Sequence, residues 1–229
     1  RQVFSSGEAL PTDIERCFFN RLGCELHNLY GPTEAAIDVT FWQCQPESKL
    51  PTVPIGYPIS NTQIYILDPL LQPVPIGVKG ELHIGGINLA RGYFQRPELT
   101  AEKFIPNPFS SEPGARLYKT GDLARYSDNG SIEFMGRLDH QVKIRGFRIE
   151  TGEIEAVLAT HPAVRQSKVI VIDQPHKYLA AYIVSHQEQP ATSDLRQFLL
   201  KYLPDYMVPS AFMILDTLPL NSNGKLDIQ

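Results

Sequence analysis

The chain has 229 residues, enough to bury one large hydrophobic core or two smaller ones. Its 21 lysines and arginines against 25 aspartates and glutamates give a formal charge of −4, which does not favour a nucleic-acid partner. The three cysteines form no CxxC pair, no apolar run is long enough to span a bilayer, and the first residues are unlike a signal peptide. We therefore expect a cytoplasmic protein with reduced thiols that binds neither nucleic acid nor membranes. Because Arg1 opens the chain inside a strand-like run, we expect a longer protein.

The first quarter of the chain predicts a strand–helix–strand order. Residues 11–22 have helical spacing, with Thr12 and Glu15 placed as a capping box. The apolar face of this helix would consist of Ile14, Phe18 and Leu22. Strands are expected at 25–29 and 36–42. Open α/β sheets place ligands at the carboxyl ends of their strands, so the segment between these two strands is a candidate site.

Prolines and glycines punctuate the middle of the chain, from residue 51 to residue 136, and separate short strands. The expected strands are 63–67, 81–84, 117–119, 123–126 and 132–135. The turn Asp128-Asn129-Gly130 predicts a hairpin between the last two. This pattern indicates a small β-barrel or a compact sheet.

From Gln141 onward the pattern becomes βαββαβ-like, which places a domain boundary near Asp139. The expected elements are strands at 142–144, 168–172 and 180–184 and helices at 152–160 and 194–202. The apolar stripes of the two helices, which we assign to core packing, are Ile154, Val157 and Leu158, then Leu195, Phe198, Leu199 and Tyr202. The fold class is therefore a multi-lobe combination of α/β and α+β. Residues 1–58 would end an α/β subdomain, 59–138 would form a β-barrel subdomain, and 139–229 would form a C-terminal α+β domain.

The segment Asn28-Leu29-Tyr30-Gly31-Pro32-Thr33-Glu34 carries the chemistry of a nucleotide site on one short loop. Gly31 and the proline after it fix a turn, and Tyr30 offers a flat aromatic face to a base. Thr33 offers a hydroxyl to a phosphate, and Glu34 is a hard oxygen ligand suited to Mg²⁺. Taken alone, the same loop is also explained as a tight turn after a buried strand, with Glu34 in water.

Asp122, in the run Tyr118-Lys119-Thr120-Gly121-Asp122-Leu123, follows a glycine turn and is placed to accept both hydroxyls of a ribose. An aspartate that bonds only its own turn backbone is the alternative. Arg137 lies fifteen residues later, and the hairpin between them would bring it back beside Asp122.

Two further charged clusters stay open between a functional and a solvated interpretation. The segment 141–155 is dense in charge, and its charged residues include Lys143, Arg145, Arg148, Glu150 and Glu153. It would be either a solvated hairpin face or a surface for an anionic ligand. Lys225 lies at the tip of the turn Asn221-Ser222-Asn223-Gly224-Lys225, where a lysine by itself indicates only solvent.

Taken together, the motifs resemble the adenylation domains of non-ribosomal peptide synthetases, which belong to the adenylate-forming enzymes. The matching stretches are NLYGPTE at 28–34, GELHIGG with LARGY at 80–93, YKTGDL at 118–123, GRLDHQVKIRGFRIETGEIE at 136–155, LPDYMVP at 203–209 and NGKLD at 223–227. Their order spans nearly the whole chain. The wording of 136–150 favours the peptide-synthetase branch over the acyl-CoA branch.

The resemblance implies a role for each matched residue in binding ATP and Mg²⁺. Tyr30 would stack on adenine, Thr33 would contact phosphate, and Glu34 would hold Mg²⁺. Asp122 would bind the ribose with Arg137 beside it. The remaining members of the implied nucleotide site are Gly7, Glu8, Asn28, Gly31 and Lys225. Lys225 would also contact the substrate carboxylate, where a cation relieves the repulsion between two anions.

The resemblance also implies a mobile C-terminal domain and several partners. Asp139 would be the hinge of a lid that rotates between two reactions. After rotation, the hairpin at 142–146 would admit the 4′-phosphopantetheine thiol of a peptidyl carrier protein. A condensation domain of the same synthetase is a further expected partner. Residues 96–104 lie where small MbtH-like proteins bind in the family.

The resemblance identifies part of an amino-acid pocket. The implied lining is Val3, Ser5, Leu29, Ile37 and Asp38, with Lys225 at the mouth. A buried carboxylate requires a cationic or donor partner, so Asp38 favours a basic or hydroxylated substrate such as arginine, ornithine, lysine or tyrosine. A position of Asp38 at the rim of the pocket, in water, stays open.

The chain departs from the family pattern at Asn88, Thr151, Ile228 and Ser6, where glycine, leucine, arginine and glycine are usual. No departure removes a charge that the reaction needs. The family's phosphate loop, and the aspartate that pairs with the substrate amine, are expected upstream of Arg1, so this chain alone would be an incomplete catalyst. The alternatives are an acyl- or aryl-acid CoA ligase of the same superfamily and a non-catalytic docking module.

Overall fold

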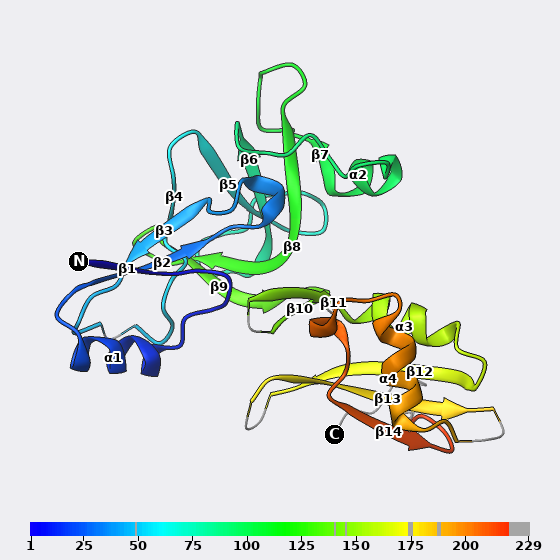
Figure 1. The fold of residues 1–229 in the computed structure, drawn as a ribbon. Coiled ribbons are helices and arrows are strands. Elements are labelled where there is room, and N and C mark those ends of the chain that lie inside the picture. Colours follow the sequence, from blue (N-terminus) through cyan, green and yellow to red (C-terminus); the bar gives the residue numbers. More distant parts are fainter. Residues whose placement is uncertain (49, 140, 145, 174–175, 187–188, 220–229) are drawn as a thin grey trace. The chain divides into compact units, whose positions relative to one another are not determined.

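The structure is a computed structural model, and it describes residues 1–48, 50–139, 141–144, 146–173, 176–186 and 189–219. The chain divides into two compact units, Arg1–Asp139 and His140–Gln229. Each unit has hydrophobic clusters of its own. Figure 1 shows that both units combine strands with short helices, so the fold is of the mixed α/β type that the sequence predicts.

The first unit begins with a four-stranded sheet in the order β1-β2-β3-β4 (Figure 1). The elements are β1 (Gln2–Ser5), α1 (Thr12–Arg21), β2 (Glu25–Tyr30), the 3-10 helix η1 (Thr33–Ala35), β3 (Thr40–Gln43) and β4 (Tyr57–Pro58). The strands β1 and β2 run parallel and are joined by α1, which confirms the predicted strand–helix–strand order. The predicted loop at 28–34 is wrong in part, because its first three residues continue β2 and a 3-10 turn begins at Thr33. The following strand begins at Thr40, four residues later than predicted.

Helix α1 differs from its prediction in how it begins and in what it buries. Its N-cap makes no side-chain hydrogen bond, so the predicted capping box of Thr12 and Glu15 is wrong. Thr12 already lies inside the helix, and Glu15 is buried in the unit at 5% exposure instead of turning back to the helix start. Of the predicted apolar face, Phe18 packs against the core, whereas Ile14 and Leu22 are exposed.

The rest of the first unit is an antiparallel sheet with the path β5-β6-β8-β7, in which β9 also pairs with β8. Its elements are β5 (Thr62–Leu67), β6 (Gly80–Gly86), α2 (Pro97–Lys103), β7 (Phe104–Pro106), β8 (Arg116–Tyr126) and β9 (Ile132–Arg137). The hairpin predicted from Asp128-Asn129-Gly130 is confirmed, because it joins β8 and β9. The two strands predicted at 117–119 and 123–126 are wrong as separate elements, since both belong to β8. Closure of this sheet into a barrel stays a prediction.

A bulge interrupts the pairing of β6 with β8. Glu81 pairs with Leu123 and His83 pairs with Lys119, so the single residue Leu82 faces three residues of β8. These three residues, Thr120, Gly121 and Asp122, form what we call the β8 bulge. Gly121 has a φ of +73°, a conformation that glycine adopts without strain. Bulges turn side chains away from the regular alternation of a strand, and this one includes the predicted ribose ligand.

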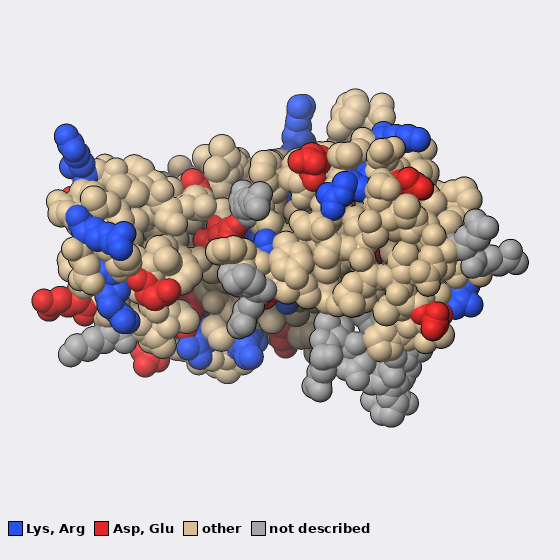
Figure 2. All heavy atoms as spheres, turned by 60° about the horizontal axis from the view of Figure 1, so that its bottom comes forward, with Lys and Arg blue, Asp and Glu red and all other residues tan. Residues whose placement is uncertain are grey.

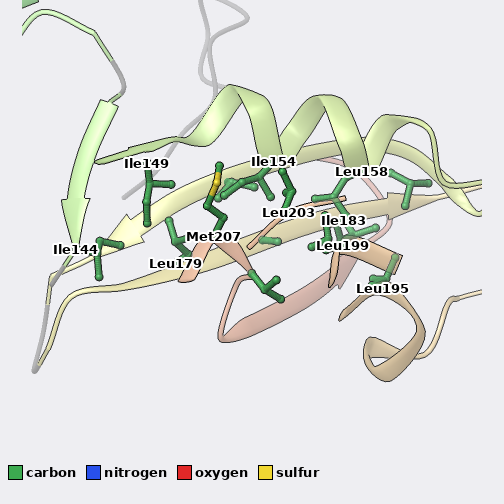
Figure 3. Close-up of a cluster of buried hydrophobic side chains, with 14 residues drawn as sticks. Ile144, Ile149, Ile154, Leu158, Leu179, Ile183, Leu195, Leu199, Leu203 and Met207 are labelled. Carbon is green, nitrogen blue, oxygen red and sulfur yellow. The ribbon is translucent and has the colours of Figure 1, made fainter. Parts of the chain in front are cut away.

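The second unit packs two helices on a three-stranded sheet in the order β12-β13-β14 (Figure 1). Its elements are β10 (Gln141–Ile144), β11 (Phe147–Glu150), α3 (Thr151–Ala159), β12 (Val164–Ile172), β13 (Tyr178–Ser185), α4 (Thr192–Leu200), the 3-10 helix η2 (Asp205–Met207) and β14 (Ala211–Leu215). Figure 3 shows the core between them, where Ile154, Leu158, Leu195 and Leu199 of the helices meet Ile183 of the sheet. Of the predicted helical stripes, Ile154, Leu158, Leu195 and Leu199 are confirmed as core, and Val157 packs against it. Phe198 is only partly buried, with its ring edge-on to His161, and Tyr202 lies beyond α4 and is 63% exposed.

Charges of both signs are interspersed over the described surface on the face drawn in Figure 2. Within the described residues the longest α-helix is α1, with 10 residues, and no helix is long and apolar enough to cross a membrane.

Candidate nucleotide-binding site

The carboxylate of Asp122 is the centre of a network that joins three strands of the first unit. Its Oδ2 atom accepts a 2.5 Å hydrogen bond from the Tyr30 hydroxyl, and its Oδ1 atom accepts a 2.6 Å bond from Nη1 of Arg137. Asp122 lies in the β8 bulge, Arg137 ends β9, and Tyr30 ends β2. The predicted approach of Arg137 to Asp122 is therefore confirmed, and Asp122 and Arg137 face each other in the ladder of the hairpin.

Tyr30 is a donor to this network because its hydroxyl keeps its proton. The side chain is 8% exposed and packs into the core beneath the sheet. Burial, followed by the neighbouring charge of Asp122, raises the pKa of Tyr30 well above its ordinary value. The hydroxyl therefore stays neutral at physiological pH and fixes one oxygen of the carboxylate.

Arg137 connects Asp122 to the last residue of the first unit. Its Nε and Nη2 atoms donate bonds of 2.7 Å to the two carboxylate oxygens of Asp139, and Nη2 also donates to the Thr120 carbonyl at 3.1 Å. The planar guanidinium suits such a two-oxygen contact. The predicted hinge residue and the predicted ribose ligand thus share one cation.

Glu34 is held by a residue that the sequence interpretation did not select. The carboxylate is buried at 8% exposure, and its Oε1 atom accepts a 2.6 Å bond from the hydroxyl of Tyr93. Burial, and then this bond to Glu34, raise the pKa of Tyr93, so the hydroxyl remains a donor. The backbone around Glu34 is also tied down, because its carbonyl accepts a 2.8 Å bond from the amide of Ala90.

The segment from Gly31 to Asp38 folds tightly back on itself. A Cβ atom on Gly31 would lie 2.1 Å from the Ile37 carbonyl oxygen and 2.7 Å from the Asp38 Cα, so only glycine fits there. Ala36 and Ile37 both have positive φ, 57° and 79°, and a branched side chain such as Ile37 adopts this conformation at a cost of about 1–3 kcal/mol. The strain falls on a predicted pocket residue.

The predicted pocket residues differ in their burial and in their partners. Ser6 donates a 2.9 Å bond to Oδ1 of Asp38, which is partly buried. Ile37 is 71% exposed and Val3 is 38% exposed, while Ser5 and Leu29 are partly buried at the ends of β1 and β2. The carboxylate of Asp38 was expected to need a hydrogen-bond donor. Ser6 of this chain supplies one such donor.

The remaining predicted site residues differ in how the structure places them. Asn28 is 1% exposed, and its side-chain amide donates to the Pro54 carbonyl at 2.8 Å, while its Oδ1 atom is buried without a hydrogen-bond partner in the described structure. Thr33 and Glu8 are exposed, and Gly7 has a φ of +92°. Lys225 lies outside the described residues.

Tyr93 and Glu81 are two site neighbours that sequence reasoning missed. Tyr93 is 59 residues from Glu34, and Glu81 accepts a hydrogen bond from the Gly121 amide 40 residues away. Both lie within the GELHIGG–LARGY stretch that the motifs had marked. The motif therefore pointed to this stretch as part of the site. It did not indicate that Tyr93 bonds Glu34 or that Glu81 bonds Gly121, because these contacts depend on how distant segments pack.

The chain's family follows from comparison with known proteins. Residues 1–94 match the AMP-binding enzymes, and residues 153–225 match the AMP-binding enzyme C-terminal domain. The chain therefore belongs to the AMP-binding enzymes, which are adenylate-forming ligases. The motifs resemble those of peptide-synthetase adenylation domains. Relatives among the peptide synthetases confirm this resemblance.

Two such relatives are similar over almost the whole chain. A dimodular nonribosomal peptide synthase of Bacillus subtilis (strain 168) is 54% identical over 231 residues, covering 99% of this chain and 9% of that protein. Bacitracin synthase 1 of Bacillus licheniformis is 49% identical over 234 residues, covering 99% of this chain and 4% of that protein. The chain thus spans less than a tenth of either relative.

A solved structure extends the likeness to the fold. Holo-PA1221, an NRPS protein containing adenylation and PCP domains bound to a vinylsulfonamide inhibitor, matches with a TM-score of 0.88 and 29% identity. The match covers 99% of this chain and 39% of that chain.

Proposed function

We propose that the protein containing this chain activates an amino acid as its adenylate with ATP and Mg²⁺, releasing pyrophosphate. It then transfers the aminoacyl group to the 4′-phosphopantetheine thiol of a carrier protein, releasing AMP. The observation that carries the proposal is the fixed carboxylate of Asp122, held by Tyr30 and Arg137 in a member of the AMP-binding enzymes. A carboxylate has about four acceptor positions, so it can accept ribose hydroxyls in addition to the bonds from these two side chains.

The residues present fit a magnesium ion that is bound together with nucleotide phosphates. No cluster of three or more His, Cys, Asp or Glu side chains able to hold a metal occurs in the described part of the chain. Mg²⁺ usually takes only one or two protein carboxylates, and substrate phosphates supply further ligands. Glu34, oriented by Tyr93, is the carboxylate we assign to it. The ion would neutralise phosphate charge as the substrate carboxylate approaches.

The roles of Lys225 and Asp139 rest on the family resemblance. Lys225 is proposed to contact the α-phosphate and the substrate carboxylate during adenylation, and Asp139 is proposed as the hinge of a mobile C-terminal lid. The contact of Asp139 with Arg137 supports the role of Asp139 as a hinge. Asp139 is the last residue of the first unit, and this contact ties it to the proposed ribose-binding residues.

A carrier protein is the partner that the comparisons support best. The similar solved protein holo-PA1221 contains both adenylation and PCP domains. We propose the same kind of partner here. A condensation domain of the same synthetase, and an MbtH-like protein at helix α2 within residues 96–104, are also proposed. A cytoplasmic location is proposed because the three cysteines indicate reduced thiols.

The proposed amino acid has a basic or hydroxylated side chain, such as arginine or tyrosine. The choice rests on the place that the family resemblance gives Asp38 in the pocket. Its carboxylate is partly buried and accepts a hydrogen bond from Ser6, and a substrate donor would have to bond it in addition. Full-rate activation of an aliphatic amino acid would contradict it.

The test is amino-acid-dependent exchange of labelled pyrophosphate into ATP, measured with the full-length protein and a panel of amino acids. Asp122→Ala should lower kcat/KM for ATP by about 10- to 100-fold, since a hydrogen bond to a charged group contributes about 1.5–3 kcal/mol. Exchange that depends on no amino acid, or CoA-dependent activation of a fatty or aryl acid, would overturn the proposal in favour of its alternatives.

A second substitution tests the proposed lid. Lys225→Ala should lower the adenylation rate by about 10²- to 10³-fold, because one electrostatic donor to the transition state is lost. Thioester formation from a preformed adenylate should change far less. Equal losses in both half-reactions would contradict the rotating lid.

A further inference from the structure

The β8 bulge interrupts the regular β6–β8 ladder, and three side chains bond its backbone. The Gly121 amide donates a 3.1 Å bond to Oε1 of Glu81. The hydroxyl of Thr120 donates to the Leu82 carbonyl at 2.6 Å and accepts from the Asp122 amide at 2.9 Å. Arg137 donates to the Thr120 carbonyl. The bulge is therefore shaped by specific side chains as well as by strand pairing.

Glu81 is the member of this set that reaches the bulge from the neighbouring strand. Strands β6 and β8 pair side by side (Figure 1), and Glu81 lies at the last regular pair before the bulge. Its side chain is 20% exposed, so the bond to Gly121 is partly shielded from water. Gly121 immediately precedes Asp122, and its φ of +73° sets the direction in which the chain enters Asp122.

The space around Gly121 is filled by the side chains of Arg137 and Asp139. A Cβ atom built on it would lie 2.8 Å from Oδ2 of Asp139 and 2.9 Å from Nη2 of Arg137. Any side chain at position 121 would thus press on Arg137, which holds Asp122, and on Asp139, which Arg137 also bonds.

We propose that Glu81 is a positioning residue that aims Asp122 at the nucleotide ribose through the Gly121 amide. The inference rests on the proposed function, because it takes Asp122 as the ribose ligand. Glu81 itself touches no substrate. A charge-assisted bond to a backbone amide is among the stronger hydrogen bonds in proteins, so its loss is expected to relax the bulge.

The experiment compares kcat/KM for ATP with kcat/KM for 2′-deoxy-ATP in pyrophosphate exchange by the full-length protein. The preference for ATP reports how well Asp122 meets the ribose. Glu81→Leu keeps much of the side-chain volume without an acceptor, and it should lower this preference by about tenfold, because small misplacements of a binding group have effects of this size or larger. Glu81→Gln keeps an acceptor oxygen and should retain the wild-type preference.

Glu133→Leu is the matched control. Glu133 is a buried carboxylate of the same sheet, bonded to Arg125 and Ser127 away from the bulge. Its loss should lower stability but leave the nucleotide preference unchanged. An equal loss of activity with both nucleotides in Glu81→Leu would overturn the inference and indicate a merely structural role.

Asp122→Ala separates the failure of this inference from the failure of the proposed function. If Asp122→Ala abolishes the preference and Glu81→Leu retains it, the positioning role is wrong and the ribose assignment stands. If the wild-type protein does not distinguish the two nucleotides, the ribose assignment is wrong, and the inference is overturned with it.

Discussion

At the scale of single residues, the candidate site is defined by neutral hydroxyls that fix buried carboxylates. Tyr30 does this for Asp122, and Tyr93 does it for Glu34. In both tyrosines, burial and the nearby carboxylate raise the pKa and keep the donor protonated. Each acid is thereby oriented by a neutral donor, and Asp122 is bonded in addition to the guanidinium of Arg137.

Tyr93→Phe should weaken the response to Mg²⁺. The variant removes the 2.6 Å bond to Glu34 but keeps the aromatic ring. Loss of a partner that orients a metal ligand typically costs about 10- to 100-fold in metal affinity, so the Mg²⁺ concentration for half-maximal pyrophosphate exchange should rise by about tenfold. The measurement is a Mg²⁺ titration at saturating ATP and amino acid.

Tyr126→Phe is the control for this titration. Its hydroxyl donates to the Ile64 carbonyl in the same sheet and has no bond to Glu34. A Mg²⁺ dependence that moves equally in both variants, or in neither, would contradict the role given to Tyr93.

At the scale of elements, helix α1 buries a carboxylic acid, Glu15, with incomplete hydrogen bonding. Glu15 is 5% exposed, and its Oε1 atom has no hydrogen-bond partner among the described residues. Burial raises the pKa of Glu15 above its ordinary value of 4.5, and a hydrogen bond from Cys44 opposes this only in part. A raised pKa in the folded state means that folding favours the protonated acid.

The sign of the pH effect follows from linkage. Stability from a raised carboxyl pKa is fully present below the unfolded value of about 4.5 and is lost as the pH rises through the folded value. Glu15→Met removes the titrating group at similar volume and should raise the free energy of unfolding by about 1 kcal/mol at pH 8, with a smaller gain toward pH 5. Denaturant unfolding at several pH values measures this difference.

Asp13→Asn is the matched control on the same helix, because Asp13 is exposed in the first turn of α1. It should give no such gain at high pH, since it instead removes a favourable charge near the helix N-terminus. A Glu15→Met gain that is independent of pH would contradict the buried-acid explanation.

The sequence predicted most helices and strands of this fold, but it did not predict the bulge within β8. The strand–helix–strand start and the apolar stripes of α3 and α4 follow from local periodicity, which a sequence shows directly. Strand β8 was divided in two because Gly121 looks like a turn, whereas the pairing with β6 continues around it. Whether a glycine ends a strand or sits in a bulge is decided by the neighbouring strand, and a local pattern does not contain that strand.

The candidate site was predictable to the same extent. Asp122 and Arg137 are joined by one hairpin, and their pairing follows from its length. The partners of Glu34 and Gly121 come from strands and loops 40 or more residues away, and no local spacing indicates them. The motifs marked the right segments, but the contacts between segments required the fold.

At the scale of the whole molecule, the two units have separate cores, and we expect their stabilities to be separable. Leu199→Ala removes a fully buried side chain from the core shown in Figure 3 and should cost about 2–5 kcal/mol in the second unit. Hydrogen exchange followed by mass spectrometry should show faster exchange in residues 140–219. Peptides from residues 1–139 should be unchanged.

The neighbouring residue provides the control. Leu200 is on the same helix and is 46% exposed, so Leu200→Ala should have an effect within about 1 kcal/mol. Faster exchange throughout residues 1–139 in Leu199→Ala would show that the units unfold together.

The three-against-one count of the β8 bulge limits how the length of this strand can vary. The bulge adds two residues to β8, which is an even number, so side chains alternate between the core and the outside in the same phase before and after it. Tyr118, before the bulge, and Ala124, after it, both lie in the same core. Inserting or deleting a single residue here would reverse that parity and turn Ala124 outward. Natural or engineered length variants at this point should therefore be tolerated only in steps of two.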